Sequence, residues 1–167
     1  MLKESVEKIL NEQIEKEAYS SYLYLSMASW AEGKGLNGVA EWLYAQAEEE
    51  KLHMLKFVHF INERGGHAII PAIKQASKVW KDIYILFEEV LKHEQYISEC
   101  INDILALAQK EKDYAVQNWI QWFVTEQIEE ESSVQNIIDK LNLLDKGKGG
   151  LYIFDKDIAS LRANSPA

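Results

Sequence analysis

Apolar residues recur at alternating steps of three and four along four long segments, which cover residues 6–31, 36–61, 83–108 and 116–141. Steps of three and four keep side chains on one face of an α-helix. Each of these faces is largely apolar, so each is expected to be buried. The pattern therefore predicts an all-α protein in which four long helices pack side by side.

Turn-forming and capping residues set the limits of these helices. We predict helices over residues 3–32, 37–64, 78–110 and 113–142, with Asn37 and Asp113 as N-terminal caps. Glycines follow the first and second helices and permit the chain to reverse. The short links make the first and second helices antiparallel neighbours, and likewise the third and fourth.

The helical pattern fails between residues 67 and 78, where Pro71 also forbids a continued helix. At about 3.3 Å per residue, this segment and its flanks can run the length of a helix of about 44 Å. A crossover between two parallel neighbours needs such a length. We therefore expect two antiparallel helix pairs joined by a long crossover between the second and third helices.

A short fifth element is predicted after the bundle. Residues 145–150 are rich in glycine and lysine and are expected to form a flexible linker. A helix over about residues 151–162 would then place four apolar residues on one side: Leu151, Phe154, Ile158 and Leu161. The length of 167 residues fits one domain, so we expect a single domain over residues 1–167 with its bundle at 3–142.

Charge and cysteine content narrow the possible partners. The formal net charge of −9 disfavours nucleic acid and anionic membranes and favours a cation. Cys100 is the only cysteine, which excludes an internal disulfide or a thiolate cluster. The N-terminus lacks a signal-peptide pattern, and no apolar run approaches the ~18 residues of a membrane span. We expect a cytoplasmic protein with no nucleic-acid or membrane partner.

Acidic residues interrupt the apolar faces near the middle of each predicted helix. The interruptions are Glu17 on the first, Glu50 with His53 on the second, Glu94 on the third, and Gln127 with Glu130 on the fourth. A carboxylate in a core costs several kcal/mol unless it is paired or bound to metal. Two carboxylates about 4 Å apart repel by roughly 4 kcal/mol at an effective dielectric near 20. Several acids that converge at one depth of the bundle therefore indicate a metal site.

Glu50 and His53 form a Glu-x-x-His pair, whose spacing points both side chains the same way. In four-helix bundles this motif, joined by glutamates from other helices, is typical of di-iron carboxylate sites. Oxygen ligands with one imidazole favour Fe²⁺ or Mn²⁺ and tolerate Zn²⁺. A single buried glutamate could instead be a satisfied polar core residue, but interruptions at one level on four helices favour a shared site.

Several neighbours have two open interpretations. Tyr24 lies two turns after Glu17 on the same face and is either a core tyrosine or a hydrogen-bonding or redox neighbour of the metals. Trp122 is expected mainly to pack. Surface helices are rich in glutamate, so three further acids are either solvated or part of the site: Glu49, Glu126 and Glu129. The other histidines have no acid at matching helical spacing and are expected to be structural or exposed: His59, His67 and His93.

In these residues the chain resembles the non-haem bacterial ferritins: Glu17, Tyr24, Glu49-Glu50-x-x-His53, Glu94 and Glu126-Gln127-x-Glu129-Glu130. The resemblance covers nearly the whole chain and implies a ferritin-like four-helix bundle with a short fifth helix. It implies a paired iron site, with Gln127 and Tyr24 beside it, at Glu17, Glu50, His53, Glu94 and Glu130. It also implies an adjacent third iron site at Glu49, Glu126, Glu129 and Glu130.

The same resemblance implies a function. Members of this family oxidise Fe²⁺ with O₂ or H₂O₂ and store ferric mineral inside a hollow shell of 24 subunits. Leu52 stands where haem-binding relatives have a methionine ligand, so we expect no haem. Cys100 alone cannot supply the cysteine-bearing iron domain of rubrerythrin-like proteins. The fifth helix separates the chain from dodecameric DNA-protecting relatives.

Two other classes of function remain open at the level of the sequence. One is a di-metal oxygenase or radical enzyme, which would want a substrate pocket and usually a second Glu-x-x-His where this chain has Gln127-x-x-Glu130. The other is a helical scaffold whose buried acids are incidental. Bound metal after purification would separate the scaffold from the first two.

Overall fold

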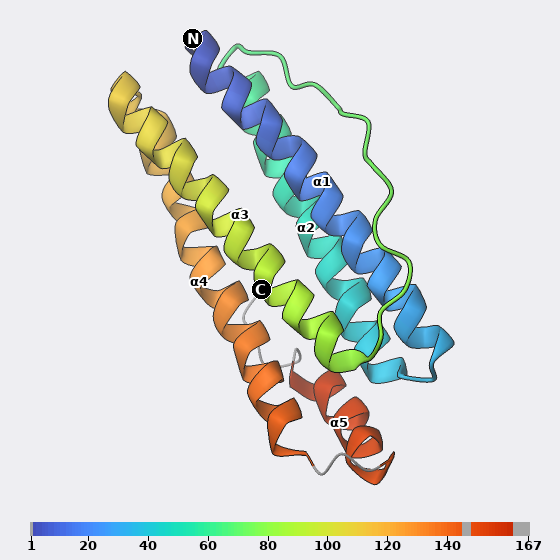
Figure 1. The fold of residues 1–167 in the computed structure, drawn as a ribbon. Coiled ribbons are helices and arrows are strands. Elements are labelled where there is room, and N and C mark those ends of the chain that lie inside the picture. The colour runs from blue at the N-terminus through green and yellow to red at the C-terminus, as the bar shows by residue number, and fades with distance from the viewer. Residues whose placement is uncertain (1, 145–147, 162–167) are drawn as a thin grey trace.

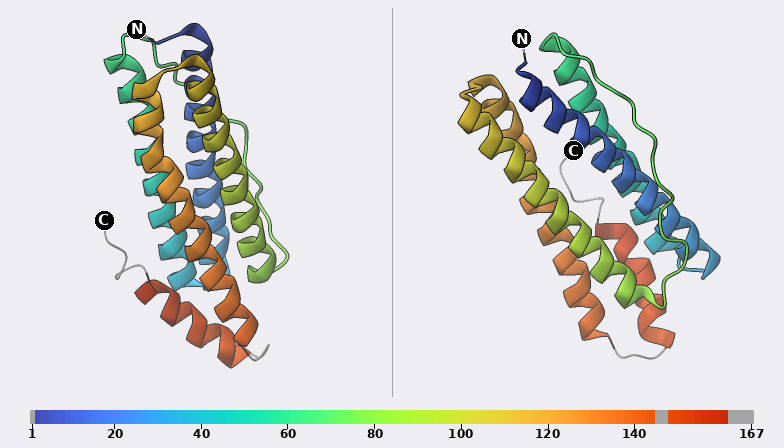
Figure 2. Two further views of the ribbon diagram at one scale, coloured as in Figure 1. Left: turned by 90° about the vertical axis from the view of Figure 1, so that its left-hand side faces the viewer. Right: turned by 45° about the horizontal axis from the view of Figure 1, so that its top comes forward.

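A computed structural model describes residues 2–144 and 148–161 of the chain. The described residues form helices and no strands: α1 (Glu4–Gly33), α2 (Asn37–Glu63), α3 (Ile83–Glu111), α4 (Tyr114–Leu143) and α5 (Lys148–Leu161). The first four are long and lie side by side, while α5 is short and crosses one end of the bundle (Figures 1 and 2). This arrangement confirms the predicted all-α bundle of four long helices with a short fifth helix.

The connections follow the predicted topology. The chain reverses between α1 and α2 and again between α3 and α4, and each pair packs antiparallel (Figure 1). Between α2 and α3 it runs along the outside of α1 from one end of the bundle to the other, which makes α2 and α3 parallel. Hydrogen bonds tie this crossover to α1: Asn11 Oδ1 accepts from Ile69 N at 2.7 Å, and Ser26 Oγ donates to Ser77 O at 2.6 Å.

The predicted start of the third helix at residue 78 is wrong, since α3 begins at Ile83. The backbone of Asp82 is extended, and its Oδ1 accepts a hydrogen bond from Ile85 N at 2.9 Å. An N-cap carboxylate satisfies a backbone donor that has no partner within the helix. Residues 78–82 therefore belong to the crossover, which must reach the end of the bundle before α3 can begin.

The predicted cap at Asn37 is also wrong, because Asn37 is already the first helical residue and Leu36 holds the cap position without a side-chain bond. The cap comes instead from α5, where Asp155 Oδ1 accepts from Val39 N at 3.0 Å. A side chain on Gly38 would not fit, since its Cβ would lie 1.8 Å from the Asp155 carbonyl oxygen. The missing side chain at Gly38 lets α5 approach closely enough to supply the cap.

The cap predicted at Asp113 is confirmed, since its Oδ1 accepts from Val116 N at 3.1 Å. Arg64, at the end of α2, also pairs with this carboxylate at 3.1 Å, which joins the two helix ends. The fifth helix begins at Lys148 rather than residue 151, so the last three residues of the predicted linker are helical. The rest of that linker and the predicted end at residue 162 lie outside the described residues.

Two apolar clusters fill the two ends of the bundle. One fills the half of the bundle beside α5 and includes Phe154 and Ile158 of that helix. The other fills the opposite half. Between them lies a layer of buried polar residues: Gln13, Glu17, Ser20, Ser21, Gln46, Glu50, His53, Glu94, Gln127 and Glu130. This layer lies in the middle of the bundle, where the sequence pattern predicts the acids. None of the described helices is long and apolar enough to cross a membrane.

Candidate metal centre

Each of the four long helices contributes to the polar layer, and every side chain predicted for the paired site is buried. The exposed fraction of these residues ranges from 1% at Glu17, Glu50 and Glu94 to 6% at Glu130. They lie near the midpoints of helices that are held in register by the apolar clusters on either side. Helix packing thus places carboxylates from distant parts of the sequence at one depth.

Glu17, Glu50 and His53 form the tightest part of this layer. One potential ligand atom from each lies within 4.8 Å of the other two. His53 Nδ1 is 3.6 Å from Glu50 Oε2 and 4.0 Å from Glu17 Oε2. Glu17 Oε2 and Glu50 Oε1 are buried and accept no hydrogen bond from any described group. Carboxylate oxygens that face one imidazole and lack donors are a fitting ligand set for a divalent cation.

Glu94 and Glu130 form the other part, and amides and a phenol orient them. Tyr24 OH and Gln127 Nε2 donate to the two oxygens of Glu94, the amide at 3.0 Å. Gln46 Nε2 donates to Glu130 Oε2 at 2.9 Å. Gln127 and Tyr24 thus both donate hydrogen bonds to Glu94. Such bonds hold a carboxylate in one orientation and leave its remaining lone pairs for a cation.

Burial perturbs the protonation of the whole layer. Burial raises the pKa of Glu17 from its usual 4.5 to about 7, although the hydrogen bond from Gln13 acts in the opposite direction. Burial, followed by repulsion from Glu94, raises the pKa of Glu50 and of Glu130 well above the usual value. The pKa of Glu94 is raised as well, chiefly by burial. Without a cation, these acids must therefore hold or share protons at neutral pH.

His53 is neutral in the same environment. Burial lowers its pKa from 6.5 to about 4, and the positive charge of Lys56 acts in the same direction. A neutral imidazole is the form that ligates metal. Its ring also lies 5.5 Å from the ring of Trp122 and 5.8 Å from that of Phe123, measured between centroids. These edge contacts fix the plane of the imidazole.

The remaining predicted acids lie to the side of this layer. Glu49, Glu126 and His53 form a second group whose ligand atoms lie within 4.8 Å of one another. Glu49 and Glu126 are only half-buried, and Glu129 is exposed and outside both groups. The pKa of Glu126 is raised by burial and then by the charges of Glu49 and Glu129. The structure thus brings two of the three outer acids together, with Glu129 close enough to act on Glu126 electrostatically.

Sequence reasoning assigned no role to two buried amides. Gln13 Nε2 donates to Glu17 Oε1 at 2.8 Å, and Gln46 contacts Glu130 from a neighbouring helix. Gln13 precedes Glu17 by four residues and Gln46 precedes Glu50 by four. This spacing is a usable signal, because residues four apart lie on one face of a helix. It predicts that both amides are near the acids, although it does not predict which acid Gln46 contacts.

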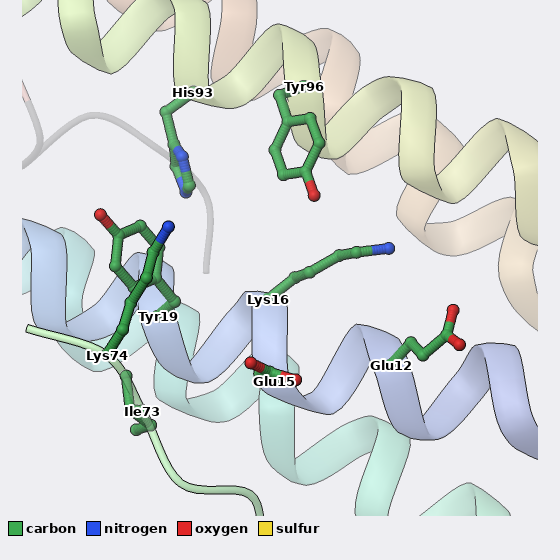
Figure 3. Close-up of a pocket in the computed structure, with 8 residues that line it drawn as sticks. All are labelled: Glu12, Glu15, Lys16, Tyr19, Ile73, Lys74, His93 and Tyr96. Atoms are coloured by element: carbon green, nitrogen blue, oxygen red, sulfur yellow. The ribbon is translucent and has the colours of Figure 1, made fainter. Parts of the chain in front are cut away.

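A surface pocket of about 500 Å³ lies between α1, α3 and the crossover. Figure 3 shows His93 of α3 pointing toward Tyr19 of α1 and Lys74 of the crossover, and Tyr96 of α3 pointing toward Lys16 of α1. His93 is half-buried, its Nε2 lies 2.7 Å from Ser20 Oγ, and its ring makes an edge contact with Tyr24. His93 therefore has a structural role, consistent with its predicted class.

The ferritin-like domain model matches residues 7–144, which is most of the chain. The chain belongs to the ferritin-like family. It is 41% identical over 161 residues to a probable bacterial non-heme ferritin-like protein of Haemophilus influenzae, covering 96% of this chain and 98% of that protein. It is 39% identical over 161 residues to a bacterial non-heme ferritin of Campylobacter jejuni, covering 96% of each chain.

Solved structures agree with these relatives. The fold matches an open pore ferritin from the archaeon Archaeoglobus fulgidus with a TM-score of 0.93 at 39% identity, covering 95% of this chain and 96% of that one. It matches a humanized archaeal ferritin with a TM-score of 0.94 at 39% identity, covering 99% of this chain and all of that one. The resemblance to non-haem bacterial ferritins is therefore confirmed over nearly the whole chain.

Proposed function

We propose that this ferritin-like protein is a ferroxidase that stores the iron it oxidises. Two Fe²⁺ ions, which are the substrate, would bind in the buried polar layer and pass one electron each to O₂ or H₂O₂. The names of the relatives support iron storage. The observation that carries the proposal is the pair of buried oxygens without hydrogen-bond donors, on Glu17 and Glu50 beside neutral His53.

The ligands would divide between the two irons according to their positions. Glu17, Glu50 and His53 are close enough together to hold one ion. Glu94 and Glu130, oriented by Gln127, Tyr24 and Gln46, would hold the other. The acids must lose their protons when metal binds, because only the carboxylate form is a ligand. Binding would thus release protons and remove the repulsion among the acids.

The finer expectations from the family resemblance belong to the same proposal. A third iron would bind beside the pair at Glu49, Glu126, Glu129 and Glu130. The oxidised iron would collect inside a homo-oligomeric shell of 24 copies in the cytoplasm. No haem would be needed, since the chemistry is confined to the carboxylates and His53. The chain would act as a single domain over residues 1–167.

One experiment tests oxidation and storage together. Fe²⁺ is added to the metal-free protein without oxygen, air is admitted, and both the oxidation rate and the iron retained per particle are measured. We expect fast oxidation and many retained irons per subunit. Oxidation without retention would overturn storage, and oxidation no faster than in buffer would overturn the ferroxidase. Glu48→Ala is the matched control, because Glu48 is exposed on α2 and pairs only with Lys51 among the interactions that the structure gives it.

A further inference from the structure

Lys56 extends the outer group of ligands along α2. Glu49, His53 and Lys56 follow one another at steps of four and three, so they lie along one face of the helix. The Lys56 ammonium lies over the ring of Trp122, 2.9 Å from its centroid. Trp122 precedes Glu126 by four residues on α4. The cation is thus held between the same two helices that supply Glu49 and Glu126.

The charge of Lys56 acts on the outer acids and on His53. It lowers the pKa of Glu126, against the effects of burial and of Glu49. It also helps to lower the pKa of His53. In return, Glu126 and Glu49 favour the charged form of Lys56, although partial burial lowers its pKa. The ammonium and the outer acids therefore form one electrostatic unit.

We propose that the Lys56 ammonium is a built-in counter-ion of the outer acids Glu49 and Glu126, and that a third metal ion must act against it in order to bind. This inference rests on the proposed function, because it sets the affinity of the outer position relative to the inner pair. Trp122 stabilises the position of the ammonium through a cation–π contact. The side chain of Lys56 is exposed and flexible, so it can move away when a divalent cation arrives.

The consequence is an order of filling. The inner acids are buried, and the charge of Lys16 lowers the pKa of Glu17 by less than burial, Gln13, Glu50 or Glu94 shift it. The outer acids already have partial compensation from Lys56 and from solvent. Binding of a cation is therefore more favourable at the inner positions, and the outer position fills last.

The test is an anaerobic titration of the metal-free protein with Co²⁺ as the probe, followed by visible absorption and calorimetry. Lys56→Met removes the charge and keeps a similar length, whereas Lys56→Arg keeps the charge. Lys51→Met is the matched control, because it removes an exposed lysine of the same helix. We expect Lys56→Met to bind the third ion about tenfold more tightly, which corresponds to about 1.4 kcal/mol. The first two ions should bind as in the unmodified protein, and the Arg and Lys51 variants should change little.

Each outcome decides between the inference and the function beneath it. A third ion that binds equally well to the unmodified protein and to Lys56→Met overturns the inference and leaves the paired site intact. Two ions and no third in every variant overturn both the inference and the outer site. No bound ion in any variant overturns the proposed function as a whole. Lys56→Gln provides a second charge-free variant if Lys56→Met does not fold.

Discussion

The inner and outer acids occupy the same helices in different surroundings. Glu50 and Glu49 are adjacent on α2, yet Glu50 is 1% exposed and lies in the core, whereas Glu49 is half-buried. On α4, Glu130 is buried and Glu129 beside it is exposed. A rotation of about 100° around a helix separates the members of each pair. The buried member of each pair needs a cation or a proton to compensate its charge, whereas water can also stabilise the other member.

The difference in burial shows that the position of a glutamate on its helix, and not its residue type, determines which role in metal binding we expect for it. Burial of an inner carboxylate is unfavourable unless a metal ion compensates its charge. The inner carboxylates should therefore bind metal first and set the geometry of the reaction. Outer carboxylates keep contact with solvent and with Lys56, so they should bind more weakly and exchange more readily. The following predictions would break or sharpen this comparison.

The largest effect is expected from removal of an inner ligand. Glu50→Ala should abolish the fast phase of Fe²⁺ oxidation, since even residues that only orient a ligand change metal affinity by about 10- to 100-fold. Stopped-flow absorption with two Fe²⁺ per subunit measures this phase. Glu48→Ala on the same helix should leave it unchanged. A normal fast phase in Glu50→Ala would remove the inner acids from the reaction.

The metal-free protein should lose stability as pH rises above 6.5. Glu17 has a pKa of about 7 when folded and 4.5 when unfolded, so its share of the loss falls between pH 4.5 and 7. The pKa values of Glu50 and Glu130, which burial raises well above the usual value, extend the loss to higher pH. His53 and His93 act in the opposite sense, because their pKa values fall from 6.5 to about 4 on folding; the stability that they add rises mainly between pH 4 and 6.5 and levels off above that pH. At about 1.4 kcal/mol per pKa unit, the loss should reach a few kcal/mol.

Unfolding of chelator-treated protein at pH 6.5 and 8.5 measures this loss. Zn²⁺ should remove most of the pH dependence, because metal takes the place of the protons. Glu50→Gln should make the metal-free protein more stable at pH 8.5 than the unmodified chain. Stability that rises with pH in this range would contradict the raised pKa values of the inner acids.

An intermediate effect is expected from the amide that orients Glu130. Gln46→Leu removes the donor at 2.9 Å from Glu130 Oε2 while it keeps the side chain similar in size. Metal affinity should fall by about tenfold, because the carboxylate loses its fixed orientation. An anaerobic Co²⁺ titration measures the change. Gln135→Leu is a suitable control, since Gln135 is exposed on the same helix as Glu130 and contacts Asp139.

The smallest effect on the first phase is expected from an outer acid. Glu129→Ala should leave oxidation of two Fe²⁺ per subunit within about twofold, because an exposed charge has a weak influence. It should instead alter the reaction with three Fe²⁺ per subunit, in stoichiometry or in oxygen consumed per iron. Equal loss of the first phase in Glu129→Ala and Glu50→Ala would show that the division into inner and outer acids is wrong.

Much of the fold and of the candidate site could be predicted because both depend on helical periodicity. The apolar steps place the four long helices, and they also place Glu17, Glu50, Glu94 and Glu130 on buried faces. Pro71 and the failed pattern around it predict the crossover. These features are local, since each follows from residues within a few turns of one another.

Contacts between side chains of different helices were decided by the tertiary structure alone. The sequence could not show that Asp155 caps α2, that Gln46 contacts Glu130, or that Lys56 rests on Trp122. Such contacts depend on the relative rotation and register of two helices, which periodicity within either one leaves undetermined. The sequence by itself determined the ligand-bearing faces, and the packing of the helices decided the partners that each ligand meets.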